Sequence, residues 1–414
     1  MNMTFDADKY PGKPKVLFIG SGISSHTHSW ISLLDKADLN VRLFALPDGV
    51  PPKDWPIKTY ITFYIHEKLN SRTRHRFLPM GLLGRILFMW NTIAKKLQLP
   101  MPYGVDKSLA DVIRNWKPDI IHTLGIFDNQ GGLFYWDVRR KFHLEKIGKW
   151  VVQTRGGSDM TLRRHDPEII PILRDVLSKC DQIISDNRAN IQYAQELGIP
   201  TSKFAGIVPI PGTGGVDVDE LSKGRTKPSQ RERIIVWTKA YDCPWSVALP
   251  VFEAIQMAWE QIRPCTIHMF VMITDGTKMW YKALPAEIRQ NCPVYDRVPR
   301  KDLLALMSRA RVLLAPSLVD GVPNSLYEAM ATGTFPIVSP LDTIVPVVEN
   351  EQNVLFARNL YPQEIADALV RAMNDDGLVD QAAQNNLRLV RQIADRASIG
   401  PKVVDFYQKL AQTE

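Results

Sequence analysis

Two carboxylates eight positions apart, Asp320 and Glu328, have the spacing in this chain that most clearly suggests chemistry. Asp320 lies in a loop of turn-forming residues. Glu328 lies in the helix that this loop is expected to open, and Gly333 is expected to end that helix. The unpaired N–H groups at a helix start attract anions. A phosphorylated ligand at this helix start, with its hydroxyls on the two carboxylates, would fit the arrangement.

Both carboxylates also have a purely structural interpretation. Ser325 and Glu328 form the S-x-x-E pattern of a capping box, in which Glu328 would only satisfy a backbone N–H at the helix start. Asp320 precedes Gly321 and would fit an ordinary turn. The two acids belong, however, to the longer pattern D-G-V-P-N-S-L-Y-E-A-M-A-T-G-T-F-P, and this combination favours a functional interpretation.

The elements that would position this stretch alternate between short apolar runs and amphipathic segments. In the N-terminal half we expect strands at residues 15–19, 41–46, 119–122, 150–154, 181–185 and 206–210. We expect helices there at residues 24–34, 107–116, 129–146, 166–179 and 187–197. This alternation predicts an α/β domain with a mainly parallel sheet.

A second alternating series follows the turn-rich segment PIPGTGG, residues 209–215. Its expected strands are residues 234–237, 267–273, 294–295, 312–315, 335–338 and 354–356. Its expected helices are residues 246–262, 301–309, 324–332, 363–374, 378–396 and 401–412. We therefore predict two α/β domains, residues 1–215 and 216–396, with a ligand cleft between them.

The composition of the 414 residues is that of a soluble globular protein, with 45% hydrophobic and 23% charged residues. The four cysteines lie far apart and form no C-x-x-C pair, which argues against structural zinc and a disulfide framework. The N-terminus is polar and lacks the apolar core of a signal peptide, and no apolar run reaches the roughly 18 residues of a membrane-spanning helix. We expect a cytoplasmic protein, and the net charge of +7 suggests an anionic partner.

Residues 58–96 differ from their surroundings, because they carry eight basic residues against the single acidic Glu67. The basic residues flank the apolar segment 77–90. Such a segment could lie on an anionic membrane face, or it could be a core-packed helix beside a solvated basic loop. The sequence leaves these two interpretations open. Nucleic acid is a poorer partner, because no nucleic-acid-binding motif accompanies the charge.

The stretch that contains Asp320 and Glu328 resembles the nucleotide-binding signature of retaining GT-B glycosyltransferases of family four, the glycosyl transferases group one set. That signature has the form E-G-x-P-x-x-x-x-E-A-M-A-x-G-x-P. Further segments also look like this family: residues 15–34, 118–122, 153–159, 181–198 and 211–217. The resemblance implies the GT-B fold, in which two Rossmann-like parallel-sheet domains face each other across a cleft. It also implies that the last helix, residues 397–414, crosses back to the N-terminal domain.

The resemblance assigns the donor sugar to the C-terminal domain. Glu328 would bind the ribose hydroxyls of a nucleoside diphosphate sugar. Asp320 would face the sugar as a catalytic residue, with the backbone N–H groups of Gly321 and Val322 on its hydroxyls. Asp320 is one methylene shorter than the glutamate usual in the family, so its contact with the sugar is expected to shift.

The diphosphate would lie at the helix start, near Asn324 and Ser325. The family usually supplies an Arg and a Lys for the leaving phosphate. Lys239 matches the Arg position, and the later Lys has no counterpart, so Arg155 and Arg297 are the candidates to replace it. Arg155 stands where many relatives have a His, and an Arg cannot act as a base at neutral pH. The family mechanism is same-face attack assisted by the leaving phosphate, which needs no protein nucleophile.

The glycine loop after the first strand is a further donor-side candidate through Gly20 and Gly22, although such glycines also serve tight βα packing. The loop lacks the third glycine of a G-x-G-x-x-G motif, which argues against nicotinamide cofactors. His26, His28 and Asp159 are acceptor-side candidates, with a helix N-cap as the structural alternative for the histidines.

Two further acidic and basic features have structural interpretations. His122, at a strand end, is expected to be structural. Asp217 and Asp219 match a D-x-D metal motif, but so short a match is common, and the family generally needs no divalent ion. We therefore expect neither a metal ion nor a resident cofactor.

Together these observations predict a retaining glycosyltransferase that moves a sugar from a nucleoside diphosphate sugar to a glycan or lipid-linked acceptor. Cell-surface polysaccharide biosynthesis at the inner face of the plasma membrane is the expected setting, with residues 58–96 in peripheral contact with the membrane. Two alternatives remain open at this point. One is a sugar-nucleotide epimerase or hydrolase of the same fold, and the other is a non-catalytic subunit that only binds the nucleotide sugar.

Overall fold

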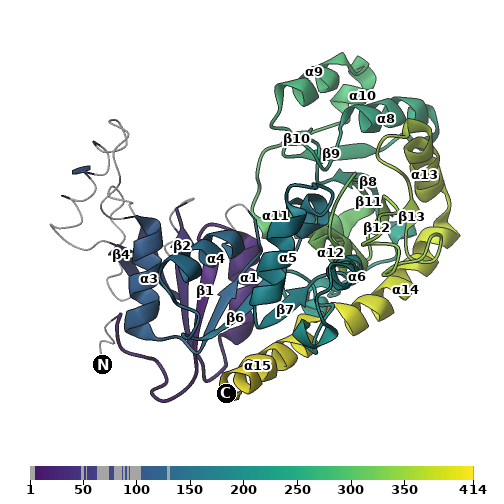
Figure 1. Cartoon of the computed structure of the whole chain (residues 1–414). Helices are drawn as coiled ribbons and strands as arrows, with labels where there is room; N and C mark the ends of the chain where they lie inside the picture. Colours follow the sequence, from purple (N-terminus) through teal and green to yellow (C-terminus); the bar gives the residue numbers. More distant parts are fainter. Residues whose placement is uncertain are drawn as a thin grey trace.

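The computed structural model of this chain forms two α/β domains, each built on a parallel sheet (Figure 1). It describes residues 5–47, 51–52, 54–62, 74–78, 86, 89–90, 93, 104–127 and 131–413. The N-terminal sheet has seven strands in the order β4-β3-β2-β1-β5-β6-β7, and the C-terminal sheet has six in the order β10-β9-β8-β11-β12-β13. The predicted fold class, two Rossmann-like parallel-sheet domains, is confirmed.

The strands of the N-terminal sheet are short and mostly buried. They are β1 (Lys15–Ser21), β2 (Asn40–Leu46), β3 (Lys58–Thr62), β4 (His75–Leu78), β5 (Ile120–Thr123), β6 (Lys149–Thr154) and β7 (Gln182–Ser185). The main helices of this domain are α1 (Ser25–Ile31), α3 (Val105–Trp116), α4 (Gly132–Lys141), α5 (Ile170–Lys179) and α6 (Arg188–Glu196). Strand β1 pairs with both β2 and β5, so the strand order reverses there, which is where doubly wound sheets bind ligands.

The C-terminal sheet repeats this design and packs against two apolar clusters. Its strands are β8 (Glu232–Trp237), β9 (Thr266–Phe270), β10 (Val294–Tyr295), β11 (Ala310–Ala315), β12 (Phe335–Val338) and β13 (Leu355–Phe356). Its helices are α7 (Val218–Leu221), α8 (Leu249–Ile262), α9 (Asp275–Ala283), α10 (Ala286–Gln290), α11 (Arg300–Arg309), α12 (Asn324–Thr332), α13 (Pro362–Asn374) and α14 (Asp376–Ile393). Strand β11 lies in the middle of this sheet and leads directly into the loop that carries Asp320.

The last helix, α15 (Arg396–Gln412), leaves the C-terminal domain and packs on the N-terminal one (Figure 1). The hydroxyl of Tyr407 accepts a hydrogen bond from Trp30 Nε1 at 3.0 Å and lies 2.5 Å from Nδ1 of His122. Arg396 donates to the carbonyl oxygen of Thr213 at 3.2 Å, close to the chain crossing between the domains. His122 is completely buried, so the structural role predicted for it agrees with its position.

The structure differs from the prediction in the N-terminal domain. Residues 206–210 form no strand, because the chain only touches the sheet edge through a bridge between Ile183 and Phe204 and then turns away. Strands β3 and β4 were not predicted. The predicted membrane segment, residues 58–96, lies mostly outside the described residues. Within the part of the chain that the structure describes, no helix is long and apolar enough to span a membrane.

Candidate active site

The loop between β11 and α12, residues 316–323, is held in place by hydrogen bonds from neighbouring loops. The backbone N–H of Ser317 donates to Ser339 Oγ at 3.0 Å. Thr343 Oγ1 donates to the carbonyl oxygen of Asp320 at 2.8 Å and to that of Gly321 at 3.2 Å. Buried backbone carbonyls need such partners. The loop that carries Asp320 is therefore fixed before any ligand arrives.

Helix α12 begins without a side-chain cap and ends as predicted. Its N-cap is Pro323, which makes no side-chain hydrogen bond. Its C-cap is Gly333, whose φ of 85° lies in the left-handed region that favours glycine. The capping-box interpretation is wrong, because Glu328 is the fifth residue of the helix and its side chain bonds other side chains. The first backbone N–H groups of α12 consequently have no side-chain acceptor from a cap.

Glu328 is held by two side chains from the C-terminal domain. Its Oε1 accepts hydrogen bonds from Arg300 Nε at 2.8 Å and from Asn324 Nδ2 at 2.7 Å, and Arg300 Nη2 is 2.6 Å away. Only 5% of Glu328 is exposed, whereas 54% of the Arg300 side chain is exposed. Burial raises the pKa of Glu328, and the Arg300 charge opposes that rise. Arg300, the first residue of α11, was missed by the sequence analysis, although it lies in the basic run 297–301.

Asp320 forms an ion pair with Lys239, which follows β8. The two side chains are largely buried, at 11% and 19% exposure. Burial by itself lowers the pKa of Lys239, but the adjacent Asp320 carboxylate outweighs it, so the pKa of Lys239 is raised. The ammonium group is therefore retained at neutral pH. The two predicted catalytic residues of the C-terminal domain are thus brought together at the carboxyl edge of the sheet.

Glycines from both domains allow the domains to come into contact next to this ion pair. A Cβ added to Gly157 would lie 3.1 Å from the Cα of Asp320, and one added to Gly321 would lie 2.5 Å from Oδ2 of Asp186. Gly156, with φ of 70°, donates its N–H to the same Asp186 oxygen at 2.9 Å. Side chains are excluded at this contact, which explains why glycines stand on both sides of it.

Asp186 is a buried acid at the cleft that the sequence analysis missed. Its Oδ1 accepts from Asn187 Nδ2 at 2.6 Å. Burial raises the pKa of Asp186 to about 7, and the charges of Asp320 and Asp159 add to the rise. The signal in the sequence was its position directly after an apolar strand, where side chains reach the carboxyl edge of a parallel sheet.

Arg155 and Asp159 lie on the N-terminal side of this contact, and both are buried. Arg155 Nη1 donates to the carbonyl oxygen of Gly212 at 3.3 Å, and burial lowers the pKa of Arg155 to about 10. Asp159 Oδ1 accepts from the backbone N–H groups of Ile126 and Phe127, each at 3.1 Å. Asp159 is fully buried, and burial raises its pKa to about 6. These hydrogen bonds let Asp159 brace two loops, and its role as an acceptor contact stays a prediction.

The two candidate histidines have different surroundings. His26 keeps contact with solvent, yet surrounding protein atoms and the charges of Arg155, Arg300 and Lys239 lower its pKa. It is therefore neutral at pH 7 and within electrostatic reach of both domains. His28 instead bonds the Gly22 carbonyl oxygen at 2.9 Å through Nε2 and stacks on Trp55 with ring centroids 3.8 Å apart. These contacts give His28 a structural role.

The remaining donor-side candidates of the C-terminal domain differ in burial and in their contacts. Asn324 bridges the domains, because its Oδ1 accepts from Thr213 Oγ1 at 2.7 Å. Val322 is buried and Ser325 is half-buried at the start of α12. Arg297 is exposed just after β10, three residues before Arg300, and makes no ion pair within the described part of the chain.

The two glycines after β1 contact only the N-terminal domain. A Cβ at Gly22 would lie 2.9 Å from the Cβ of Ala45, and one at Gly20 would lie 3.4 Å from Leu124. This favours the packing interpretation for Gly22. Asp217 caps α7 by accepting from the N–H of Glu220 at 3.0 Å, which gives the D-x-D match a structural explanation. Among the described residues, no group of three or more His, Cys, Asp or Glu side chains could hold a metal ion.

The comparisons with known proteins agree with this geometry. Residues 249–375, which include the loop at Asp320 and helix α12, match the family model described as "Glycosyl transferases group 1". The chain has the GT-B fold, and its residues 249–375 are similar to the group 1 glycosyltransferases. No curated protein is similar enough in sequence to match the chain.

Three solved structures illustrate how widely this GT-B fold is shared. HepE from Anabaena in complex with UDP-glucose is 13% identical, with 94% of this chain and 98% of that chain covered and a TM-score of 0.63. Sucrose-phosphate synthase from Thermosynechococcus elongatus is 15% identical, with 96% and 99% covered and a TM-score of 0.65. A protein from Listeria monocytogenes named as a UDP-N-acetylglucosamine 2-epimerase is 11% identical, with 97% and 98% covered and a TM-score of 0.62. At these identities the likeness shows the fold alone.

Proposed function

We propose that this protein is a retaining glycosyltransferase that moves a sugar from a nucleoside diphosphate sugar to a glycan or lipid-linked acceptor. The observation that carries the proposal is the arrangement around α12. Two carboxylates, each with its own cation, flank an uncapped helix start at the carboxyl edge of the sheet. The family match of residues 249–375 supports a sugar transfer, and the UDP-glucose complex of HepE supports a nucleotide-sugar donor.

In this proposal the donor nucleotide is bound by residues that already contact one another. Glu328 accepts hydrogen bonds from the ribose hydroxyls, and the exposed Arg300 is displaced toward solvent as they arrive. The uncapped start of α12, with Asn324 and Ser325, receives the diphosphate through backbone N–H groups. A diphosphate at this position is stabilised by the positive end of the helix dipole and by hydrogen bonds from the backbone N–H groups.

Catalysis in this proposal depends on charge placed where the leaving group forms. Lys239 neutralises the departing phosphate, and Asp320 then contacts the hydroxyls of the sugar. The buried Arg155 adds a fixed positive charge from the N-terminal domain. Attack from the face that the phosphate leaves retains the anomeric configuration, and the phosphate oxygen takes the acceptor proton. Neither a metal ion nor a resident cofactor is needed.

The acceptor in this proposal lies on the N-terminal side of the cleft, beside the neutral His26. A lipid-linked glycan would explain the basic and apolar residues of the segment 58–96 as a peripheral contact with the inner face of the plasma membrane. Synthesis of a cell-surface polysaccharide in the cytoplasm is the corresponding biological setting. This part of the proposal rests on the sequence, since the segment lies mostly outside the described residues.

The decisive experiment is a donor panel of UDP-, GDP- and ADP-sugars, assayed with Glu328→Gln and a matched control. Loss of a hydrogen bond to a charged acceptor costs about 1.5–3 kcal/mol, so kcat/KM for the preferred donor should fall roughly 10- to 150-fold. Glu351→Gln is the control, because Glu351 is an exposed acid of the same domain that pairs with Arg371. Its kcat/KM should stay within about twofold. Equal turnover in the two variants would contradict the proposal.

The same assay separates the alternatives. Proton NMR of the product gives its anomeric configuration, which should be that of the donor. Incubation with donor alone should leave the sugar unchanged over the time of transfer. An isomerised sugar would indicate an epimerase instead, and donor binding without turnover across the panel would indicate a non-catalytic subunit.

A further inference from the structure

A cavity lies at the amino-terminal ends of the strands of the N-terminal sheet, opposite the strand ends that face the active-site cleft. Its volume is about 650 Å³. It opens among the amino-terminal ends of β2 and β3 and the segment before β4. Its lining comprises Ala7, Asp8, Lys9, Leu34, Asp35, Ala37, Leu39, Asn40, Val41, Arg42, Pro56, Ile57, Lys58 and Arg74. None of these residues belongs to the donor or acceptor side described above.

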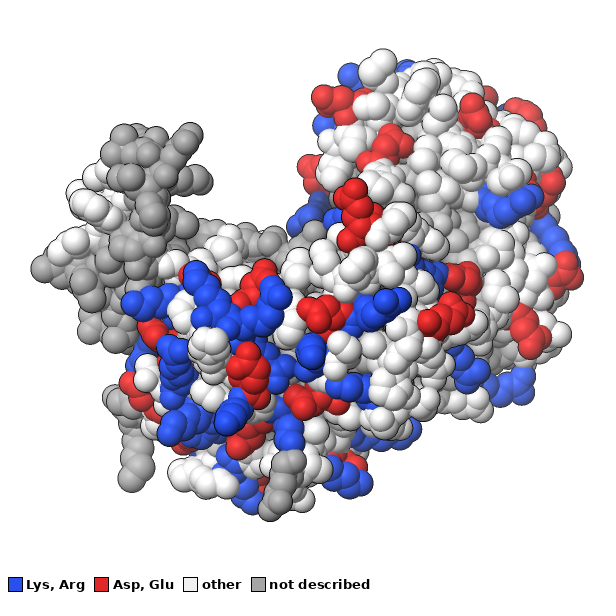
Figure 2. Space-filling model, in the orientation of Figure 1, with Lys and Arg blue, Asp and Glu red and all other residues white. Residues whose placement is uncertain are grey.

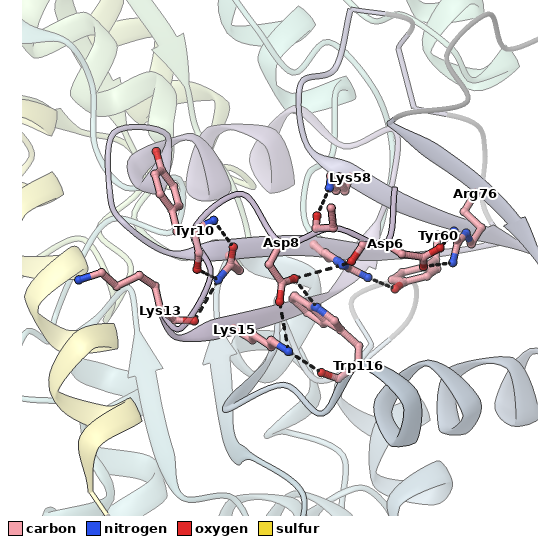
Figure 3. A network of polar contacts seen from close by, with 12 residues as sticks. Asp6, Asp8, Tyr10, Lys13, Lys15, Lys58, Tyr60, Arg76 and Trp116 are labelled. Atoms are coloured by element: carbon pink, nitrogen blue, oxygen red, sulfur yellow. Dashed lines mark hydrogen bonds and ion pairs between the residues drawn. The ribbon is translucent and has the colours of Figure 1, made fainter. Parts of the chain in front are cut away.

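The charges of this lining do not balance. It contains four cationic side chains, on Lys9, Arg42, Lys58 and Arg74, against two acidic ones. Asp8 is already engaged, because Lys15 Nζ and Arg42 Nη2 each lie 3.2 Å from its oxygens (Figure 3). The lining therefore contains two more cationic side chains than acidic ones.

Arg42 is a fixed positive charge at the floor of the cavity. It is 3% exposed and donates to Tyr60 Oη at 2.6 Å and to the carbonyl oxygen of Asp6 at 2.9 Å. Its guanidinium lies 4.3 Å from the ring centroid of Trp116. These contacts fix the position of the side chain, which is also paired with Asp8. A buried cation held in this way attracts an anion with no further cost of ordering.

Lys58, the first residue of β3, is a second cation of the cavity lining. Its Nζ donates to the Ala7 carbonyl oxygen at 2.5 Å. Burial lowers the pKa of Lys58, the Arg42 charge lowers it further, and the charges of Asp8 and Asp6 oppose this shift. An additional anion between these cations would relieve their repulsion. Figure 2 shows Lys and Arg side chains gathered over this domain, which would steer anions toward it.

We infer that this cavity binds the phosphate group of an anionic ligand. The cations Lys58, Arg74 and Lys9 lie around the mouth, and Arg42 lies beneath. The apolar part of the wall would contact the portion of the ligand to which the phosphate is attached. It is formed by Leu34, Leu39, Val41, Pro56 and Ile57. Two sources share this chemistry, the headgroup of an anionic phospholipid and a soluble phosphate compound.

The first test measures how inorganic phosphate shifts the melting temperature of the full chain. The Lys58→Gln, Arg74→Gln double variant removes two of the four cations and should weaken the apparent phosphate affinity about tenfold. Lys179→Gln, an exposed lysine of the same domain outside the cavity, should leave it unchanged. Phosphate bound in the cleft affects all three proteins equally. Their differences therefore report on the cavity alone.

A gain of affinity provides a second test that does not depend on loss of a side chain needed for folding. Asp35 lines the cavity, whereas Asp38 is an exposed acid of the same loop that does not. Asp35→Asn should tighten phosphate binding about threefold, because one repelling charge is removed, and Asp38→Asn should not. Circular dichroism confirms that every variant is folded.

Vesicles distinguish the two sources. Sedimentation with phosphatidylglycerol vesicles, compared with phosphatidylcholine vesicles, shows whether the wild-type chain binds the lipid-borne phosphate and whether the double variant loses this binding. Loss of vesicle binding in the double variant assigns the cavity to a lipid headgroup. Loss of phosphate binding alone assigns it to a soluble compound. If the double variant matches the wild type with both probes, the inference is overturned, whatever the fate of the proposed enzyme activity.

Discussion

The two domains of this protein differ in where they carry charge and where they use it. Residues 1–215 contain 29 Lys and Arg against 20 Asp and Glu, a net charge of +9. Residues 216–414 contain 22 against 24, a net charge of −2. Nevertheless, Lys239 and Arg300, which pair with the two carboxylates of the donor site, come from the acidic half.

This difference shows that net charge and functional charge are separate properties. The C-terminal domain uses few cations, each held beside one carboxylate at the carboxyl edge of its sheet. The N-terminal domain spreads its cations over its surface (Figure 2). Four of them line the cavity at the amino-terminal ends of its strands. The overall charge of +7 therefore indicates an anionic partner without indicating which domain binds the donor.

The largest expected effect follows from removing a donor-site cation from the acidic domain. Lys239→Gln should lower kcat for sugar transfer roughly 10²- to 10³-fold, because a fixed charge at a developing anion is usually worth that much. Lys179→Gln removes the same charge from the basic domain and should change kcat less than twofold. Steady-state kinetics with saturating donor would measure both. Equal losses would mean that the total charge matters more than its position.

A smaller effect is expected where α15 joins the two domains. Tyr407→Phe leaves Trp30 Nε1 and His122 without their shared partner, so the free energy of unfolding should fall by about 1–3 kcal/mol. Tyr361→Phe is the matched control in the C-terminal domain, because Tyr361 is 48% exposed. Its effect should stay within about 0.5 kcal/mol. Urea denaturation would measure the two values, and similar values would show that the buried hydroxyl does not stabilise the domain junction.

The smallest expected effect is a change in how stability depends on pH. Asp186 has a pKa of about 7 in the folded chain against 3.8 for an ordinary aspartic acid. The folded state holds this proton between about pH 4 and pH 7 and the unfolded state does not, so stability decreases as pH rises through that window. The wild type should therefore lose stability between pH 5 and pH 8. Asp186→Asn should show a shallower decrease.

This pH test compares the acids of the two domains. Asp159, with a pKa of about 6, also makes stability fall as pH rises. Part of the decrease in stability should therefore remain in Asp186→Asn. Asp137→Asn, which changes an exposed acid of α4, should retain the full wild-type dependence. Urea midpoints at the two pH values provide the measurement. An unchanged slope in Asp186→Asn would show that Asp186 is ionised throughout.

The sequence predicted the strands of the C-terminal domain better than those of the N-terminal one, for a physical reason, although it missed helices α7, α9 and α10. Strands such as β11 and β12 are apolar on both faces, and Gly333 ends α12 at a position that only a left-handed residue fits. Such signals are local and need no knowledge of the partner. Strands β3 and β4 could not be found in this way. Strand β4 is an edge strand and β3 lies next to it, and their polar residues, such as Lys58 and Arg76, contribute no clear alternation.

The sequence by itself determined the βα order, the division into two parallel sheets and the pairing of Asp320 and Glu328 around one helix start. Only the tertiary structure decided which side chains those acids meet. Arg300 reaches Glu328 from 28 residues away, and Lys239 reaches Asp320 from 81 residues away. The periodicity of a segment shows only which of its own faces is buried. These ion pairs depend instead on which strand ends the fold brings together at the carboxyl side of the sheet.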